Sequence, residues 1–288
     1  MMTVPIKSYG KFDLFWIVFA IFVRINSGTM FLFKKKIPES LGRSVFGLRF
    51  PHPVGITPGA DPYGKKYNSF RSFSFVEIGP LSPSEELRDT LSGASSTSLK
   101  EAILNIRKHP PRTLLAANIA PLTNAPDCES VTHDLLQSFT FMYDFADMFI
   151  IDTFRKNNDG VAPLQSAEFL SESMDALIDM RFCYDNYKPI LIRVDNNIRQ
   201  GSLAGLLDYM MYSGLDGIIA GYDAYPLELV RRIGYFTGGR FPVIACGSIE
   251  TPEEADELLA AGATLLQVDR KHARGILRHL IDKETSDK

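Results

Sequence analysis

The stretch that decides the fold is residues 241–268, FPVIACGSIETPEEADELLAAGATLLQV. Val243–Cys246 is a short apolar run, and a second one follows at Thr264–Val268. Between them, residues 251–254 (TPEE) offer a capping threonine, a proline at the first helical position and two acids, which are typical of a helix start. Because parallel strands need a crossover between them, this stretch predicts one strand–helix–strand unit of an α/β fold.

The same alternation repeats from Pro53 to the end of the chain. The expected strands are Val54–Thr57, Phe75–Ile78, Thr113–Ile119, Met148–Asp152, Ile190–Val194, Gly217–Ala220, Val243–Cys246 and Thr264–Val268. The expected helices include Val131–Phe145, capped by Ser130, and Leu164–Arg181, Gly201–Tyr212, Leu227–Tyr235 and Pro252–Ala260. Eight such units favour a closed (β/α)8 TIM barrel over an open doubly wound sheet, which would prefer a GxGxxG turn that the sequence lacks.

Composition narrows the class of protein further. The chain has 288 residues, of which 45% are hydrophobic and 23% charged, as in an ordinary globular protein. Lys plus Arg is 31 and Asp plus Glu is 34, so the net charge of −3 argues against a nucleic-acid partner. The three cysteines and five histidines are scattered, without CxxC or HExxH, so we expect a cytoplasmic protein with no disulfide framework and no metal site.

The first forty residues differ from the rest. Residues 1–40 are expected to form an apolar helical extension ahead of a barrel domain at residues 41–288. Leu14–Val23 holds ten apolar residues in a row, half of what a membrane span needs, and Lys34–Lys36 add a basic edge. Residues 12–36 therefore suit a peripheral membrane contact; a helix packed on the barrel and a signal peptide are the alternatives.

Any active site of a barrel lies where the strands end. The turn after the first expected strand, with Pro58 and Gly59, lets backbone approach a flat ligand. The loops after the seventh and eighth strands commonly hold a phosphate, and ordinary strand-to-helix turns are the alternative. In these two loops the candidate residues are Gly247, Ser248, Asp269 and Arg270.

Polar residues at other strand ends suit a planar ligand rich in heteroatoms. Asn118, Asp152 and Asn157 are candidates for a polar ring around such a ligand. Arg193 stands in a strand that reads as fully buried, and a buried cation needs a partner. We expect it either to pair with Asp152 or to meet an anionic ligand.

Five stretches resemble one family in order and spacing. They are residues 45–55 (VFGLRFPHPVG), 75–79 (FVEIG), 117–119 (ANI), 241–249 (FPVIACGSI) and 261–268 (AGATLLQV). The pattern, over roughly residues 40–285, resembles the dihydroorotate dehydrogenases, most of all the membrane-associated class 2 enzymes. The two-part apolar N-terminus is similar to the class 2 extension, which forms a quinone entry at the membrane.

The resemblance implies a barrel that holds FMN at the strand ends. It also implies oxidation of dihydroorotate to orotate in pyrimidine biosynthesis, with a quinone as electron acceptor. Asn118 and Asn157 match asparagines that fix the substrate in the family. The residues expected to bind the cofactor are Pro58, Gly59, Arg193, Gly247, Ser248, Asp269 and Arg270.

The chain departs from the family at positions where the family has its catalytic and ligand-binding residues. Arg155 stands where the family has its serine base, Asp152 replaces an asparagine, and Arg193 replaces a lysine. Further departures are Pro62 for a lysine, Tyr222 for an asparagine and Ser248 for a glycine. A divergent barrel, catalytically altered or inactive, that binds a small ligand or partner is therefore the alternative function. A lyase or aldolase ranks third, because it would need a lysine where Arg193 stands.

Overall fold

The structure is a computed structural model that describes residues 36–83, 97–122, 127–153 and 167–286. The chain divides into two units, Met1–Pro38 and Glu39–Lys288, and the fold described below is that of the second. The apolar run Leu14–Val23 and most of the expected N-terminal extension lie outside the described residues. None of the helices that are described is long and apolar enough to cross a membrane.

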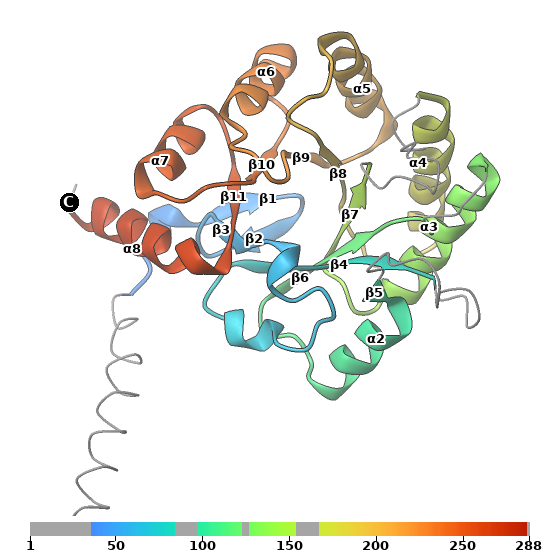
Figure 1. Cartoon of the computed structure of the whole chain (residues 1–288), viewed down its shortest axis with the longest axis horizontal. Helices are drawn as coiled ribbons and strands as arrows, with labels where there is room; N and C mark the ends of the chain where they lie inside the picture. Colours follow the sequence, from blue (N-terminus) through green and yellow to red (C-terminus); the bar gives the residue numbers. More distant parts are fainter. Residues whose placement is uncertain (1–35, 84–96, 123–126, 154–166, 287–288) are drawn as a thin grey trace, which may run out of the picture. The chain divides into compact units, whose positions relative to one another are not determined.

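Eight parallel strands close into a barrel (Figure 1). Each strand pairs with the next around the barrel, and β3 pairs with both β11 and β4, which completes the ring. The strands are β3 (Val54–Ile56), β4 (Phe75–Ser82), β6 (Leu114–Ile119), β7 (Met148–Asp152), β8 (Ile190–Val194), β9 (Gly217–Ala220), β10 (Val243–Cys246) and β11 (Leu265–Val268). The predicted (β/α)8 barrel is confirmed. A short extra strand, β5 (Thr97–Ser98), runs beside the end of β4.

Helices surround the strands (Figure 1). Those in the described residues are α2 (Leu99–Lys108), α3 (Cys128–Met142), α4 (Ala167–Arg181), α5 (Gln200–Ser213), α6 (Leu227–Thr237), α7 (Pro252–Ala260) and α8 (Arg270–Ser286). The first crossover, between β3 and β4, instead holds two 3-10 helices, η3 (Pro58–Ala60) and η4 (Tyr67–Phe70). The bounds of α7 are those predicted, because Thr251 and Glu254 form a capping box at its start.

The predicted N-cap of α3, the helix expected at Val131–Phe145, was wrong. Ser130 does not cap it; the side chain of Asp127 accepts a hydrogen bond from the backbone N–H of Ser130, and the helix begins at Cys128. Asp and Ser are both good caps, so the sequence offers two starts three residues apart. The structure uses the earlier one, which adds nearly a turn to the helix.

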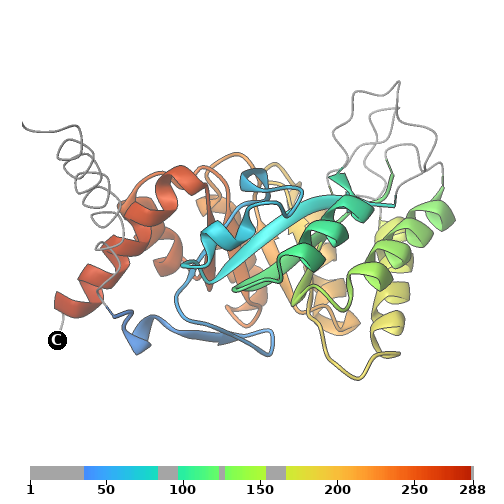
Figure 2. The ribbon, with the colours of Figure 1, turned by 90° about the horizontal axis from the view of Figure 1, so that it is seen from below.

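A hairpin that the strand pattern did not predict closes one end of the barrel. Strands β1 (Arg43–Val45) and β2 (Leu48–Phe50) pair antiparallel, and Phe46 and Gly47 between them both have positive φ, as a tight primed turn requires. Figure 2 shows this hairpin at the end where the parallel strands start. The ring of Phe50 packs edge-on against Phe46 and Phe75, with centroids 6.5 and 5.7 Å away.

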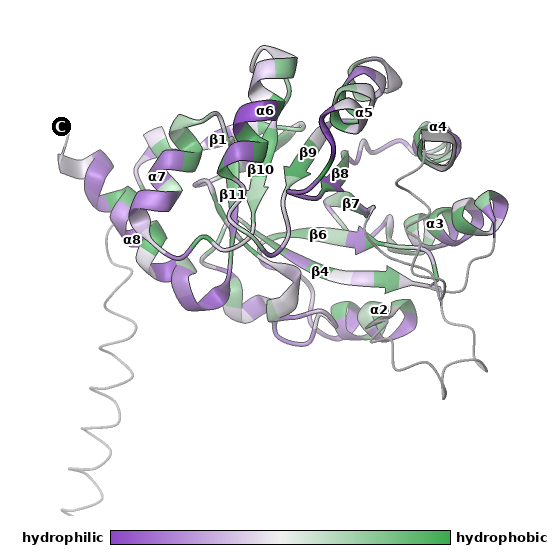
Figure 3. Ribbon diagram, turned by 45° about the horizontal axis from the view of Figure 1, so that its top comes forward, coloured by the Kyte–Doolittle hydropathy of each residue, from purple (hydrophilic) through white to green (hydrophobic). Residues whose placement is uncertain are grey.

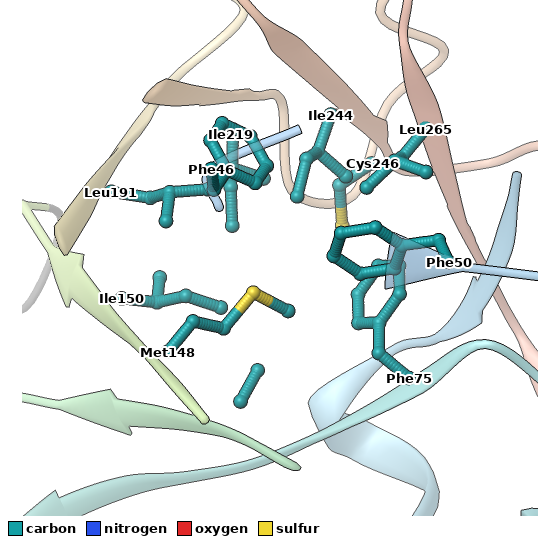
Figure 4. Packing of buried hydrophobic residues seen from close by; sticks show 11 residues of the cluster. Phe46, Phe50, Phe75, Met148, Ile150, Leu191, Ile219, Ile244, Cys246 and Leu265 are labelled. Atoms are coloured by element: carbon teal, nitrogen blue, oxygen red, sulfur yellow. The ribbon is translucent and has the colours of Figure 1, made fainter. Parts of the chain in front are cut away.

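The lower half of the barrel interior is a closed apolar core (Figure 4). It comprises Phe46, Phe50, Phe75, Ala116, Met148, Ile150, Leu191, Ile219, Ile244, Cys246 and Leu265. Figure 3 shows the strands hydrophobic along most of their length, as expected of strands covered on both faces. This core fills the end near the hairpin, so any ligand site must lie at the opposite end, where the strands finish.

Candidate functional site

A polar layer lies directly above the apolar core. In four strands, the residue two positions after a core residue is polar: Glu77 in β4, Asn118 in β6, Arg193 in β8 and Gln267 in β11. Side chains of a strand alternate between its two faces, so these four project into the same interior, one layer nearer the carboxyl ends. All four are fully buried.

Glu77 is the centre of this layer. Its Oε1 accepts a hydrogen bond from Nδ2 of Asn118 at 2.8 Å, and its Oε2 accepts one from Nη2 of Arg193 at 2.5 Å. Nε2 of Gln267 also donates to Oε2, and Oε1 of Gln267 accepts from Nη2 of Arg193 at 3.1 Å. One carboxylate thus ties together side chains from four strands. We call these four residues the Glu77 network.

Arg193 is a permanent cation within the network. Burial alone lowers the pKa of Arg193, but the nearby Glu77, Cys246 and Asp152 raise it, and the net shift is upward. Arg193 therefore stays protonated although it is fully buried. Burial raises the pKa of the neighbouring Cys246 thiol to about 12, so this cysteine is neutral and is not a nucleophile at physiological pH.

Several polar atoms of the network have no protein partner. Nε and Nη1 of Arg193 and Oδ1 of Asn118 are buried and make no hydrogen bond within the described part of the chain. Each such group costs about 1–3 kcal/mol when it is left unpaired. Tyr222, from the loop after β9, lies over the guanidinium, 5.6 Å from ring centroid to Arg193, and its side chain is half-exposed. Unused donors and an unused acceptor beside an accessible ring are what a binding site for a polar planar ligand would present.

Asp152 stands beside this charge. It ends β7 in register with Arg193 on β8, and it is almost fully buried. The neighbouring Thr153 donates its hydroxyl to the backbone carbonyl of Arg193 at 2.8 Å. The ion pair of Arg193 is with Glu77, which the sequence did not suggest as its partner, while Asp152 acts on Arg193 through its charge.

The turn after β3 has open space beside Gly59. Pro58 is buried in η3, and a side chain added at Gly59 would meet nothing within 4 Å. The carboxylate of Asp61 organises the rest of the loop by accepting the backbone N–H groups of Lys65 at 2.9 Å and Lys66 at 2.6 Å. The protein around position 59 would therefore tolerate a side chain, and a part in ligand binding stays a prediction for Gly59.

The loops after β10 and β11 carry the remaining candidates. The Ser248 hydroxyl donates to the backbone carbonyl of Asp223 at 2.5 Å. The carboxylate of Asp269 accepts the backbone N–H of Lys271 at 2.7 Å, at the start of α8. The guanidinium of Arg270 lies over the ring of Phe70, 6.0 Å from its centroid.

The structure thus joins Asn118 and Arg193 through Glu77 and places Asp152 next to them. Arg155 and Asn157 lie outside the described residues. Sequence reasoning missed Glu77 and Gln267 as site residues, although a charged or amide side chain inside the apolar runs FVEIG and LLQV was a usable signal. Within the described ranges, no group of three or more His, Cys, Asp or Glu side chains could hold a metal ion.

Comparisons with known proteins find similar chains along most of the sequence. No family model matches the chain. A protein of Christiangramia forsetii named dihydroorotate dehydrogenase (quinone) is 26% identical, and the match covers 86% of this chain and 85% of that protein. One of Cellvibrio japonicus with the same name is 25% identical, over 82% of each chain.

Over most of its length this chain is similar to proteins named dihydroorotate dehydrogenase (quinone). Two solved structures of dihydroorotate dehydrogenase from Eimeria tenella, one ligand-free and one in complex with ferulenol, superpose with a TM-score of 0.74. They share 17–18% sequence identity with this chain and cover 87% of it, which shows a common fold. The resemblance to dihydroorotate dehydrogenases that the sequence indicates is confirmed by the relatives named above.

Proposed function

We propose that this protein is an FMN-dependent oxidoreductase of the dihydroorotate dehydrogenase kind, which oxidises dihydroorotate to orotate in pyrimidine biosynthesis. The observation that carries the proposal is the Glu77 network, a buried cation with unused N–H groups at the carboxyl end of the barrel. It lies in a chain whose relatives, over more than four fifths of its length, are named dihydroorotate dehydrogenase (quinone).

The residues of the network fit the ring system of FMN. A flavin ring is flat and bears carbonyl oxygens and ring nitrogens, which suit Nε and Nη1 of Arg193 as donors and Oδ1 of Asn118 as acceptor. The bound flavin would supply the hydride acceptor. The part of Arg193 would be to hold a fixed positive charge beside it, because Glu77 and Gln267 fix the guanidinium in place. Pro58 and Gly59 would border the ring from the turn after β3.

The substrate's proton needs a separate acceptor. Oxidation of a dihydropyrimidine removes a hydride, with its electron pair, from one carbon and a proton from the neighbouring carbon. The electron pair that the departing proton leaves on carbon forms the ring double bond. Arg155 is a poor base because arginine stays protonated. Asp152 is a carboxylate at the end of β7 beside Arg193, so a carboxylate oxygen of Asp152 would take the proton. Asn118 and Asn157 would orient the substrate by hydrogen bonds.

The electron acceptor would be a quinone reached at a membrane surface. The support is the printed name of the relatives together with the apolar residues 12–36 and their basic edge. Deletion of residues 1–36 should release the protein from the membrane fraction of a lysate into the supernatant. Unchanged partitioning of the truncated chain would contradict this part of the proposal.

The decisive experiment is the visible spectrum of the purified full chain, followed by an assay of orotate formation with a quinone or dye acceptor. We expect a flavin band and orotate production. Absence of the band, with no uptake of added flavin, would overturn the proposal and favour a divergent barrel that binds another small ligand or a partner.

Two variants test the assigned roles. Asp152→Asn restores the asparagine of the family that this chain resembles. It should lower kcat by about 100-fold or more if Asp152 takes the proton. Arg193→Lys restores the family's lysine, and it should keep the flavin band because the charge remains. Full activity of Asp152→Asn would assign that residue to substrate orientation alone.

A further inference from the structure

The loops after β10 and β11 lie where a barrel usually receives a phosphate, yet several of their polar groups are engaged within the protein. The backbone N–H groups of Glu250 and Thr251 both donate to Oε2 of Glu254, at 2.7 and 3.0 Å. At the start of α8, Oδ1 of Asp269 accepts the N–H of Lys271. Both helix starts are therefore occupied by carboxylates of this chain, at positions where an incoming anion would be repelled.

The glycine and serine of the first loop are also used internally. Gly247 has a φ of 145°, and a Cβ there would collide with the backbone carbonyl oxygen of Ala224. The next residue, Ser248, gives its hydroxyl to the carbonyl of Asp223. A glycine at position 247 thus allows the β9–α6 loop to pack directly against the backbone there. Two carbonyl oxygens point their negative ends at this turn, which again disfavours an anion.

Of the two cations in the loop after β11, Lys271 is exposed and Arg270 is directed toward another part of the barrel. The guanidinium of Arg270 lies over the ring of Phe70 in η4, in the first crossover of the barrel. A phosphate monoester carries about −1.5 to −2 charges at neutral pH and seeks N–H groups and cations. Besides these two cations, the loops present two carboxylates and two carbonyls. These acceptors suit a hydroxyl group, which can donate a hydrogen bond.

We infer that this end of the barrel receives the uncharged hydroxyl end of a flavin side chain and not a phosphate, so that riboflavin binds at least as tightly as FMN. The inference rests on the proposed flavin function, and it changes the expected form of the cofactor from FMN to riboflavin. The ring would still be held by Arg193 and Asn118. Ser248 and Asp269 would accept hydrogen bonds from the hydroxyls of the side chain.

The purified full chain is first stripped of any bound flavin. It is then titrated separately with riboflavin and with FMN, and binding is measured by the quenching of flavin fluorescence. The expected ratio of the two dissociation constants, riboflavin over FMN, is about one or less. A ratio of ten or more, with FMN the tighter ligand, would overturn the inference and leave the flavin function standing. If neither flavin binds, the proposed function itself fails and this inference fails with it.

A matched pair of variants locates the effect. Asp269→Asn keeps a good helix cap but removes the negative charge, so FMN should gain up to about fivefold over riboflavin. Asp185→Asn makes the same charge change in the exposed loop between α4 and β8, at the other end of the barrel, and should leave the ratio unchanged. An unchanged ratio in Asp269→Asn would mean that Asp269 does not face the ligand.

Discussion

The two ends of this barrel bury polar side chains in opposite ways. At the lower end, His52 is buried and burial lowers its pKa to about 4, so the imidazole is neutral at physiological pH. Its ring accepts the N–H of Val54 at 3.2 Å and bonds the carbonyl of Ser72 at 3.0 Å, so both ring nitrogens are used. At the upper end, Arg193 keeps its charge because Glu77 is paired with it, and two of its three nitrogens are unused.

The difference suggests a structural role for His52 and a binding role for Arg193. A neutral, fully hydrogen-bonded group is the low-cost solution for a core. A charged group with unused donors is costly, and under the proposed function a ligand would satisfy those donors. The predictions below test this contrast between the two ends.

The largest effect is expected from Glu77→Leu. The substitution leaves Arg193 as a buried cation without its ion-pair partner, which should cost about 3–5 kcal/mol of unfolding free energy. The double variant Glu77→Leu/Arg193→Met should recover most of this loss but abolish flavin binding. Urea denaturation measures the first and fluorescence titration the second. A loss below about 1 kcal/mol in the single variant would show that Glu77 is not needed to balance the charge.

The apolar layer should behave differently. Leu265 is fully buried two residues before Gln267, and Leu265→Ala should cost about 3–4 kcal/mol by leaving a cavity. Flavin affinity of the folded fraction should be unchanged, since the Glu77 network keeps its residues. A tenfold loss of affinity would mean that the two layers do not act independently.

His52 should make stability depend on pH. The unfolded chain takes up a proton near pH 6.5, whereas the folded chain does so only near pH 4. The stabilising contribution is therefore complete above about pH 6.5 and is lost as the pH falls toward 4, by at most about 3 kcal/mol. His52→Gln cannot titrate at this position and should flatten the curve of unfolding free energy against pH between these values. An unchanged slope would assign the pH dependence to other groups.

The smallest effect is expected from Tyr222→Leu. The ring lies over Arg193 at the rim, so its loss should change the unfolding free energy by less than about 1 kcal/mol. Flavin affinity should fall a few-fold, because the guanidinium loses a neighbour on the side of the loops. A large loss of stability with unchanged affinity would place Tyr222 in the core and not at the site.

Much of the fold could be read from local patterns. Four strands, at Met148, Ile190, Gly217 and Val243, have the predicted bounds, because each is a short apolar run between clear turn or helix signals. The hairpin of β1 and β2 was missed because its strands have only three residues each. Their place is set by the contacts of Phe46 and Phe50 inside the barrel, which a local pattern does not contain.

The candidate site was predicted only in part for a similar reason. Asn118, Asp152 and Arg193 were found because they interrupt or end apolar strands. Glu77 and Gln267 interrupt strands in the same way. Their importance depends on their shared partner Arg193, which lies 116 residues from Glu77 and 74 residues from Gln267 in the sequence. Hydrogen bonds over such separations follow from closure of the barrel and from register, and neither is written in any one segment.

The sequence alone therefore determined the succession of strands and helices and the family that the motifs resemble, because periodicity, caps and short motifs are local properties. The tertiary structure decided which polar residues meet. Only a closed ring of eight strands brings Glu77 to Arg193. Only the packing of the β9–α6 loop engages Gly247 and Ser248, two of the residues that the sequence assigned to a phosphate site. Distances between residues far apart in the chain fix charge balance and unused donors, and these decide what the barrel can bind.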